Sequence, residues 1–336
     1  MLFFSAFLRG VFSFYSYNRN VDRVTSERVK EMIFDAHCDV LYQLQKDPLK
    51  DFNDPRLHVT YRGLKQAKAK VQCFAIFLSP LVKPHDRFRS ALEQIDLFYE
   101  KVISPYPDMK VITTKKELDE LKEGEIGAVL TLEGGEAIEE DPLKLKTLYR
   151  LGVRSVGLTW NHTNALADGV MAARGGGITE LGGEVVHMLN EWKTWTDVSH
   201  LSEKAFWDVM EQADYPIASH SNCYSLCPHP RNLKNDQIKA LIQKDSIIGL
   251  SFVPFFVKDH GKVHAQDVIK HVEYICELGG ENHLGFGSDF DGIDETVQGL
   301  DCYEAYERWR ELLQKYYSER QVEKFCWLNF ASRFPS

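Results

Sequence analysis

Residues 33–41 read IFDAHCDVL, a stretch that begins as an apolar strand and ends in polar groups. Because side chains alternate along a strand, Asp35, His37 and Asp39 would all point to one side of the sheet. Three ionisable groups that converge without a partner would be costly to desolvate. The stretch therefore predicts a buried strand that carries an imidazole and carboxylates to a functional site at its carboxyl end.

Seven further apolar runs follow, and amphipathic segments separate them. The predicted strands cover residues 33–37, 71–78, 126–132, 153–159, 196–200, 216–220, 246–253 and 283–288. The predicted helices include residues 142–151, 202–213, 236–244 and 265–278, with Ser202 as the expected N-cap of the second. Most strands are continuous apolar runs, which is typical of parallel strands covered on both faces. Eight such strands separated by helices predict an α/β fold, a (β/α)₈ barrel of the TIM type.

Two aromatic segments depart from this regular pattern. The fifth strand lies in NEWKTWTDVSH, residues 190–200, which is polar and Trp-rich where a buried strand is expected to be aliphatic. Residues 325–334 combine Phe with Trp and are predicted to form a closing helix that packs on the barrel. No repeat, Pro-rich linker or low-complexity segment suggests a second domain, so residues 32–336 are predicted to form a single domain.

Residues 1–31 are interpreted separately from the barrel. Their first half is apolar and aromatic, but Arg9 interrupts it and the run is too short for a transmembrane helix. The basic region that precedes the apolar core of a signal peptide is missing. Since Met32 directly precedes the first strand, we expect residues 1–31 to be a misplaced translation start or a dispensable, disordered extension. A weak interfacial anchor is the alternative, and no stable membrane span is expected.

The composition excludes several classes of protein. Hydrophobic residues make up 44% of the 336 residues and charged residues 26%, which is typical of a globular protein. The net charge of -9 argues against nucleic-acid binding. Seven cysteines form an odd number without a repeating framework, which indicates a reduced, cytoplasmic protein.

Five of the predicted strands end in groups that can bind a metal. These groups are His37 and Asp39, Glu133, His200, His220, and Asp289. A single His after a strand is more often a structural or solvated residue, but coincidence across five strands is much less plausible. The carboxyl ends of the strands form the face on which barrel enzymes place their active sites. We therefore expect these side chains to converge.

The residue types indicate the chemistry of the site. Imidazole and carboxylate ligands suit Zn²⁺ and its neighbours. Three carboxylates and three imidazoles exceed the roughly three protein ligands of a single catalytic zinc. A pair of metals about 3.5–4 Å apart and bridged by a carboxylate would use them all. A remaining carboxylate can then move protons.

The motifs around these residues resemble the membrane (renal) dipeptidase family, which consists of zinc dipeptidases with an amidohydrolase-like barrel. The resemblance runs from about residue 33 to the end of the chain. It rests on the motifs FDAHCDVL, LTLEGG, LGVRSVGLTWN, NALADG, DVSHLSEKAF, PIASHSNCYSLCPHPRN and GFGSDFDG.

This resemblance implies a role for each residue of the site. His37 and Asp39 would bind one zinc ion, Glu133 would bridge two ions, and His200 and His220 would bind the second. Asp289 would transfer protons, and Arg231 would bind the substrate. A hydroxide that bridges the two metals would attack the peptide bond of a dipeptide, and a D-residue at its C-terminal position would be tolerated.

One position departs from the family pattern. Many eukaryotic members carry a His directly after the Leu-Thr that ends the fourth strand, where it is thought to stabilise the tetrahedral intermediate. Here Trp160 occupies that place, as in a bacterial branch of the family, and His162 follows two residues later. We expect His162 to contact the substrate and donate to the oxyanion. The alternatives are that His162 is a solvated loop residue and the metal alone stabilises the oxyanion, or that Trp160 is the donor.

Two other functions remain open at this point. One is another dinuclear barrel hydrolase, such as a deacetylase, lactonase or phosphoesterase. The other is a non-catalytic metal-binding or scaffold protein, although none of the presumptive ligands is missing. Cys223, Cys227 and His229 lack a fourth ligand and are interpreted as packing residues. A small dipeptide is the expected partner, and a homodimer is compatible with the sequence.

Overall fold

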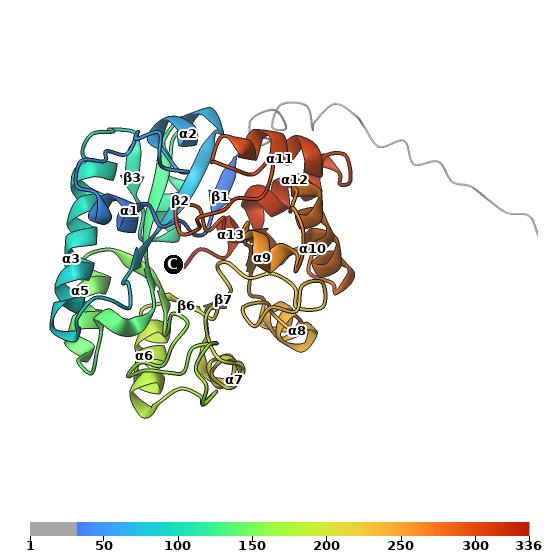
Figure 1. Ribbon diagram of the computed structural model, residues 1–336. Coiled ribbons are helices and arrows are strands. Elements are labelled where there is room, and N and C mark those ends of the chain that lie inside the picture. Colours follow the sequence, from blue (N-terminus) through green and yellow to red (C-terminus); the bar gives the residue numbers. More distant parts are fainter. Residues whose placement is uncertain (1–31, 336) are drawn as a thin grey trace, which may run out of the picture.

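The computed structural model describes residues 32–335, which form a barrel of parallel strands surrounded by helices (Figure 1). The barrel strands are β1 (Ile33–Asp35), β2 (Ala69–Phe77), β4 (Ile126–Glu133), β5 (Val153–Gly157), β6 (Trp195–Asp197), β7 (Pro216–Ile217), β8 (Ile248–Leu250) and β9 (Leu284–Phe286). They pair in the order β7-β6-β5-β4-β2-β1-β9-β8, and a parallel bridge between Ala218 and Ile248 brings the two ends together. The predicted (β/α)₈ barrel is confirmed.

A ninth strand lies beside the barrel. β3 (Met109–Val111) pairs with the beginning of β4, where Met109 lies opposite Ile126. The sequence analysis missed it because it is only three residues long and buries only Met109.

The helical elements cover the outside of the barrel. The α-helices are α1 (Val40–Lys46), α2 (Tyr61–Gln66), α3 (Arg87–Leu97), α4 (Lys115–Asp119), α5 (Pro142–Arg150), α6 (Glu180–Glu191), α7 (Glu203–Gln212), α8 (Asn235–Gln243), α9 (Pro254–Val257), α10 (Ala265–Glu277), α11 (Ala305–Leu313), α12 (Glu319–Glu323) and α13 (Asn329–Ser332). Short 3₁₀ or π turns are η1 (Pro84–Asp86), η2 (Phe98–Ile103), η3 (Gly135–Ala137) and η4 (Lys324–Leu328). Ser202 caps α7 as predicted, because its side chain accepts a hydrogen bond from the backbone N–H of Ala205.

Seven of the eight barrel strands end one to three residues earlier than the sequence predicted, and β6 and β7 are two of them. β6 and β7 were expected to reach residues 200 and 220, but they end at Asp197 and Ile217. The Asp197 carboxylate explains part of this difference, since it accepts hydrogen bonds from the backbone N–H groups of Ser199 and Ser219. These two N–H groups are thus satisfied by a side chain instead of by a neighbouring strand.

The Trp-rich fifth strand owes its composition to the closed end of the barrel. Trp195 begins β6, and its ring centre lies 5.2 Å from that of Phe334 and 6.1 Å from that of Phe330. Phe34 stacks on Phe330 at 5.0 Å, so one cluster joins the first strand to the C-terminal segment. As expected, residues 325–334 pack on the barrel, and the chain ends near its centre in Figure 1. An aromatic side chain replaces an aliphatic one here because its neighbours are aromatic.

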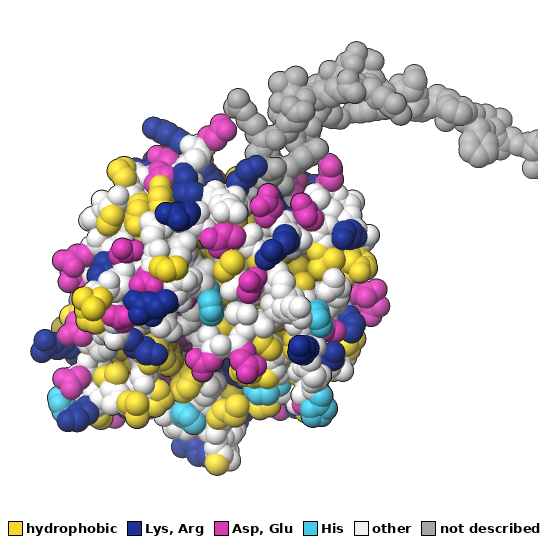
Figure 2. All heavy atoms as spheres, turned by 45° about the horizontal axis from the view of Figure 1, so that its top comes forward, with side chains coloured by type: hydrophobic (Ala, Val, Ile, Leu, Met, Phe, Trp, Pro, Cys, Tyr) yellow, Lys and Arg dark blue, Asp and Glu magenta, His cyan; other side chains and the backbone are white. Residues whose placement is uncertain are grey.

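The remaining expectations concern the surface and the N-terminus. On the face drawn in Figure 2, Lys and Arg side chains are interspersed with Asp and Glu. Within residues 32–335, no helix combines the length and the hydrophobicity that a membrane crossing requires. The interpretation of residues 1–31 lies outside the described part of the chain.

Candidate metal centre and active site

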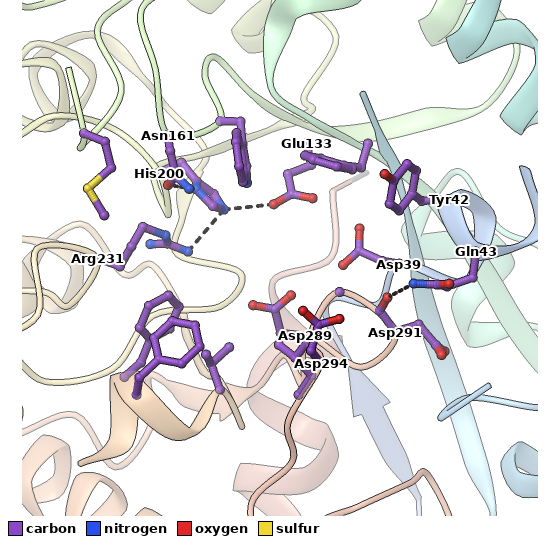
Figure 3. A pocket seen from close by; sticks show the side chains of 18 of the residues that line it. Asp39, Tyr42, Gln43, Glu133, Asn161, His200, Arg231, Asp289, Asp291 and Asp294 are labelled. Atoms are coloured by element: carbon purple, nitrogen blue, oxygen red, sulfur yellow. Dashed lines mark hydrogen bonds and ion pairs between the residues drawn. The ribbon is translucent and has the colours of Figure 1, made fainter. Parts of the chain in front are cut away.

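The predicted ligands converge at the carboxyl ends of the barrel strands. His37 and Asp39 follow β1, Glu133 is the last residue of β4, and Asp289 follows β9. His200 and His220 each lie three residues beyond their strands. Figure 3 shows the open side of the site, a cavity of about 280 Å³ lined by Asp39, Glu133, His200, Arg231 and Asp289 among others.

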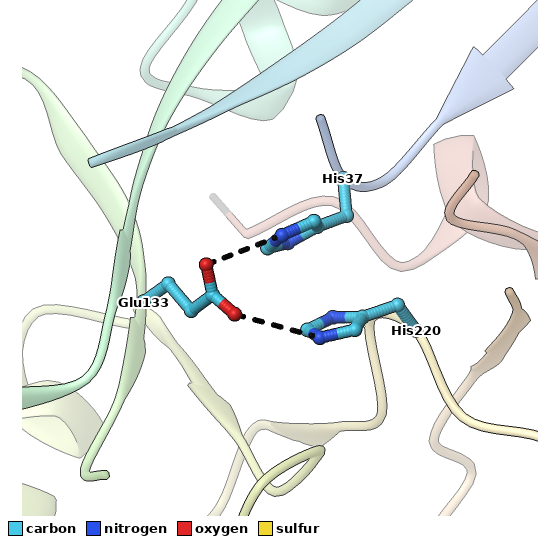
Figure 4. Close-up of side chains that lie close together, drawn as sticks. All are labelled: His37, Glu133 and His220. Atoms are coloured by element: carbon cyan, nitrogen blue, oxygen red, sulfur yellow. Dashed lines mark ion pairs between the residues drawn. The ribbon is translucent and has the colours of Figure 1, made fainter. Parts of the chain in front are cut away.

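Glu133 lies between the imidazole groups. Its Oε2 is 3.5 Å from Nε2 of His37, and its Oε1 is 2.9 Å from Nε2 of His200. His220 also faces this carboxylate, with Nε2 3.8 Å from Oε1 (Figure 4). The two oxygens of Glu133 therefore face different imidazoles, which is the arrangement that a bridging carboxylate requires.

The hydrogen-bond partners of the Nδ1 atoms of His200 and His220 indicate the tautomer of each imidazole. Nδ1 of His200 lies 2.9 Å from Oδ1 of Asn161, which can only accept a hydrogen bond. Nδ1 of His220 lies 2.7 Å from the hydroxyl of Ser219, which donates its own proton to Asp197. Both Nδ1 atoms therefore carry the proton, and both Nε2 atoms present a lone pair.

These lone pairs face each other, and Nη2 of Arg231 donates to only one of them, that of His200, at 3.2 Å. Nε2 of His200 and Nε2 of His220 are 2.8 Å apart, and both point at Oε1 of Glu133, another acceptor. Nearby, Nε2 of His37 and Oδ1 of Asp39 are buried, and neither has a hydrogen-bond partner in the described part of the chain. Acceptors that crowd together in this way need a cation, so the residues fit a site for divalent metal ions.

The grouping of the ligands differs from the predicted assignment in three respects: His37 belongs to both groups, Asp289 joins one of them, and His200 belongs to neither. Among the described residues, two groups can each hold an ion: His37 with Glu133 and His220, and His37 with Asp39 and Asp289. The rings of His37 and His220 are only 3.9 Å apart between centres. His220 therefore lies close to both halves of the site.

The electrostatics of two of the three histidines match metal binding. At His37, burial lowers the pKa, but Glu133 and Asp39 outweigh burial and hold this pKa well above its usual value. Burial lowers the pKa of His200 to about 4, and the positive charge of Arg231 acts in the same direction. Burial, His37 and Arg231 hold the pKa of His220 well below its usual value. Both imidazoles are therefore neutral near pH 7, which is the form that binds a metal.

The carboxylates of the site also have perturbed pKa values. Burial and the neighbouring Glu133 raise the pKa of Asp39 well above its ordinary value. Burial also raises the pKa of Asp289. Burial alone would raise the pKa of Glu133, but His37 and His200 outweigh it and hold this pKa below its usual range. The positive charge nearby is thus too small to keep all the buried carboxylates ionised. Groups in a cleft with such perturbed pKa values are typical of a functional site.

Arg231 lies at one end of the cavity and is only 3% exposed. Its guanidinium donates to the carbonyl oxygens of Ser199 and His220 and lies 3.2 Å from Nε2 of His200. Among residues 32–335, its Nε has no hydrogen-bond partner. Burial lowers the pKa of Arg231 to about 10, so it keeps its positive charge at neutral pH. A buried cation with a free donor at the edge of a cavity suits an anionic ligand group.

The structure separates the two candidates at the end of the fourth predicted strand. Trp160 lines the cavity, with its ring 5.3 Å from that of Phe77 and 6.3 Å from that of His200. His162 is exposed and is absent from the cavity wall, although its ring lies 5.8 Å from that of Trp160.

Cys227 contacts the carbonyl of Phe255 and belongs to neither metal group.

Sequence reasoning missed two residues that hold the ligands in place. Asn161 orients His200, and Asp197 accepts hydrogen bonds from the hydroxyls of both Ser199 and Ser219. A signal for Asp197 was present, because it is a charged residue inside the predicted strand 196–200. Nothing in the sequence pattern distinguished Asn161 from an ordinary loop residue.

The loop after β9 is shaped around the carboxylates. Asp289 and Asp291 both adopt positive φ angles, +64° and +67°, which are uncommon for residues with a side chain. Asp291 accepts hydrogen bonds from the backbone N–H groups of His58 and Val59, which fixes the loop. A Cβ at Gly292 would overlap Oδ2 of Asp39 and lie 2.8 Å from Oδ1 of Asp289. Such strain at a site is maintained only when its surroundings enforce it.

Comparison with known proteins adds to this geometry. The family model described as Membrane dipeptidase (Peptidase family M19) matches residues 21–333. An uncharacterised protein of the PQQ-III 3′ region of Acinetobacter calcoaceticus is 30% identical, with matches over 73% of this chain and 89% of that protein. Dipeptidase tcpJ from Claviceps purpurea is 29% identical, with matches over 88% and 74%.

Two solved structures share the fold. The metallopeptidase from Rhodobacter sphaeroides, liganded with a phosphinate mimic of the dipeptide L-Ala-D-Ala, superposes with a TM-score of 0.84 at 24% identity over 90% of this chain and 98% of that chain. The dipeptidase AC of family M19 superposes with a TM-score of 0.84 at 26% identity, over 91% and 98%. Together with the converging ligands, these findings identify the chain as a metal-dependent dipeptidase that belongs to the membrane dipeptidase family, peptidase family M19.

Proposed function

We propose that this protein hydrolyses the peptide bond of dipeptides with two zinc ions that share Glu133. The observation that supports this proposal most directly is the pair of imidazole lone pairs facing one oxygen of Glu133 while His37 faces the other. His37 and Asp39 would hold one ion, and His200 and His220 the other. Bound in this way, two divalent ions lower the pKa of a water molecule and polarise a carbonyl group.

Asp289 is the proposed proton carrier. Its carboxylate lines the cavity, and Oδ1 lies 3.9 Å from Nε2 of His37. Because burial raises its pKa, the carboxyl can hold a proton more readily than an exposed one. It would take the proton of the attacking water and deliver it to the nitrogen of the leaving amine.

Arg231 is the proposed partner of the substrate carboxylate. Its Nε has no partner, and Nη2 is engaged with His200, whose lone pair a metal would occupy. Both donors on this edge would then be available for a bidentate contact. This role separates a dipeptidase from a deacetylase, lactonase or phosphoesterase, whose substrates need no free carboxylate at that position.

The shape of the cavity supports a proposal for the oxyanion partner. The place of Trp160 in the cavity wall, and of His162 outside it, favours the indole N–H of Trp160 as the donor. The phosphinate mimic bound by the Rhodobacter sphaeroides metallopeptidase supports tolerance of a D-residue at the C-terminal position.

Three broader proposals accompany the activity. All seven cysteines are free, which supports a reducing, cytoplasmic location. We propose that residues 32–336 fold as one domain, so a chain that begins at Met32 should bind metal and turn over as the full chain does. The protein is further proposed to form a homodimer, which sedimentation would test.

Metal analysis combined with a dipeptide library tests the proposed function. Purified protein should hold close to two zinc ions per chain and hydrolyse dipeptides but not their C-terminal amides. His200→Ala should lose one ion and most activity, whereas His187→Ala, at an exposed histidine on α6, should retain both. One ion per chain in a fully active preparation would refute the dinuclear site.

A further inference from the structure

The two ends of the active-site cavity differ in chemistry. Around Arg231, the wall is formed by Met171, Val253, Phe255 and Phe256, which we name the apolar shelf. The opposite end is more polar: the side chains of Tyr42 and Gln43 lie across Asp289 and Asp39 from Arg231 in Figure 3, although Phe77 packs against Tyr42 there with 5.1 Å between ring centres. A ligand that spans the cavity therefore meets the apolar shelf at the Arg231 end and a mixture of polar and aromatic groups at the other.

The apolar shelf is partly exposed to solvent. Phe255 is 56% exposed and Met171 is 43% exposed, while Phe256 and Val253 are buried beneath them. Large apolar side chains that line a cavity and remain accessible are typical of surfaces that bind a partner or a ligand.

Part of the shelf lies against the guanidinium. The ring of Phe256 lies 5.3 Å from Cζ of Arg231, and the ring of Phe255 packs against that of Phe256 at 4.8 Å. The backbone N–H of Met171 donates to the carbonyl of Asn161, the residue that orients His200. The backbone of the shelf is thus tied to the segments that carry Arg231 and the metal ligands.

We propose that the apolar shelf receives the side chain of the C-terminal substrate residue, and that the enzyme prefers dipeptides in which this residue is large and apolar. This inference rests on the proposed function, in which Arg231 binds the substrate carboxylate. The Cα of that residue is bonded directly to the carboxylate, so its side chain must lie within a few ångströms of Arg231. Burying a side chain of this kind on an apolar surface removes both from water.

A comparison of two dipeptide series tests the inference. One series keeps L-Ala first and varies the C-terminal residue through Gly, Ala, Leu, Phe, Asp and Lys in both configurations. The other varies the first residue and keeps the preferred configuration of Ala second. In the first series, kcat/KM for Leu or Phe should exceed that for Gly by at least about 10-fold, a typical value for an apolar pocket. The second series should show a smaller preference.

Variants of the shelf complete the test. Phe255→Ser and Met171→Ser should each lower the ratio of kcat/KM for Phe to that for Gly. Tyr316→Ser is a matched control, because Tyr316 is 59% exposed and does not line the cavity, and it should leave this ratio unchanged.

Three outcomes would count against the inference, and they are distinguishable. Equal kcat/KM values along the first series would overturn it while leaving the dipeptidase activity intact. A Phe255→Ser variant that changes its sedimentation but keeps the same ratio would show that the shelf is a contact between subunits. Failure to hydrolyse any dipeptide in the zinc-loaded protein would overturn the proposed function itself.

Discussion

The substitution Asp197→Asn tests whether Asp197, which is not among the expected metal ligands, controls the tautomer of His220, which is one of them. Oδ1 of Asp197 accepts from the N–H of Ser199 at 3.1 Å, the hydroxyl of Ser199 at 2.7 Å and the N–H of Ser219 at 3.0 Å. Oδ2 accepts from the hydroxyl of Ser219, which leaves that oxygen free to accept from Nδ1 of His220. The carboxylate is needed at this position because all four of its contacts are donors.

An amide at position 197 can satisfy only part of this network. Its oxygen can keep the three contacts of Oδ1, but its NH₂ group then faces the hydroxyl of Ser219. That hydroxyl must accept from the amide and send its own proton to Nδ1 of His220. The imidazole would then carry its proton on Nε2, where it cannot bind a metal. In the reverse orientation, the NH₂ group of the amide would face the three donors that contact Oδ1 in the parent protein. This arrangement is less favourable still, because all four groups are donors.

The expected magnitude follows from this change of tautomer. Loss of such a supporting contact typically costs roughly 10- to 100-fold in metal affinity, which is about 1.4 to 2.8 kcal/mol. We expect the upper half of this range for the divalent metal ion that His220 would bind, because a whole ligand is affected. Competition with a chromogenic chelator measures the dissociation constant of each ion.

A double-mutant cycle separates this effect from general damage. In a Ser219→Ala background the link to His220 is already absent, so Asp197→Asn should weaken zinc binding by a smaller factor. Urea unfolding of the metal-free proteins reports the stability change alone. A dissociation constant within twofold of the parent protein would refute the reasoning, as would an equal loss in both backgrounds.

The remaining predictions concern acid stability, the β9 loop and the oxyanion. Burial lowers the pKa of His271 to about 4, so the unfolded chain binds the proton first as the pH falls below about 6.5. The stability that comes from neutral His271 is therefore present above that pH and is lost toward pH 4. In urea unfolding, His271→Gln should make the decrease in unfolding free energy between pH 7 and pH 5 smaller by about 2 kcal/mol. An equally large decrease in the variant would assign the pH dependence to other groups. Gly292→Ala should displace Asp39 and lower zinc content and turnover at least tenfold, whereas Gly183→Ala on α6 should do neither. Trp160→Ala should lower kcat by roughly 100-fold with zinc content unchanged, and His162→Ala should stay within twofold; the reverse result would return the oxyanion role to the histidine.

The fold and the identity of most site residues could be predicted from the sequence because both depend on local patterns. A buried parallel strand needs a continuous apolar run, so each barrel strand left a visible signal. The carboxyl ends of parallel strands meet at one face, so His37, Glu133 and Asp289 could be brought together without knowing any loop. Their convergence follows from the topology alone.

The details that complete the site depend on contacts between distant segments. The path after β5 is held by bonds from Gly169 to His162 and from Val170 to His200, and these turn His162 away from the cavity. The presence of an aromatic side chain at position 195 is explained by its contact with Phe334, which lies far away in the sequence.

The supporting residues of the ligands were hidden for the same reason. Asp197 acts on His220 through Ser219, across two neighbouring strands, and Asn161 reaches His200 from the loop after a third. The sequence determined the barrel and the ligand types, because backbone pairing and side-chain alternation act over a few residues. Only the tertiary structure decided tautomers, cavity walls and loop positions, because those depend on hydrogen bonds and packing between segments that the order of residues does not bring together.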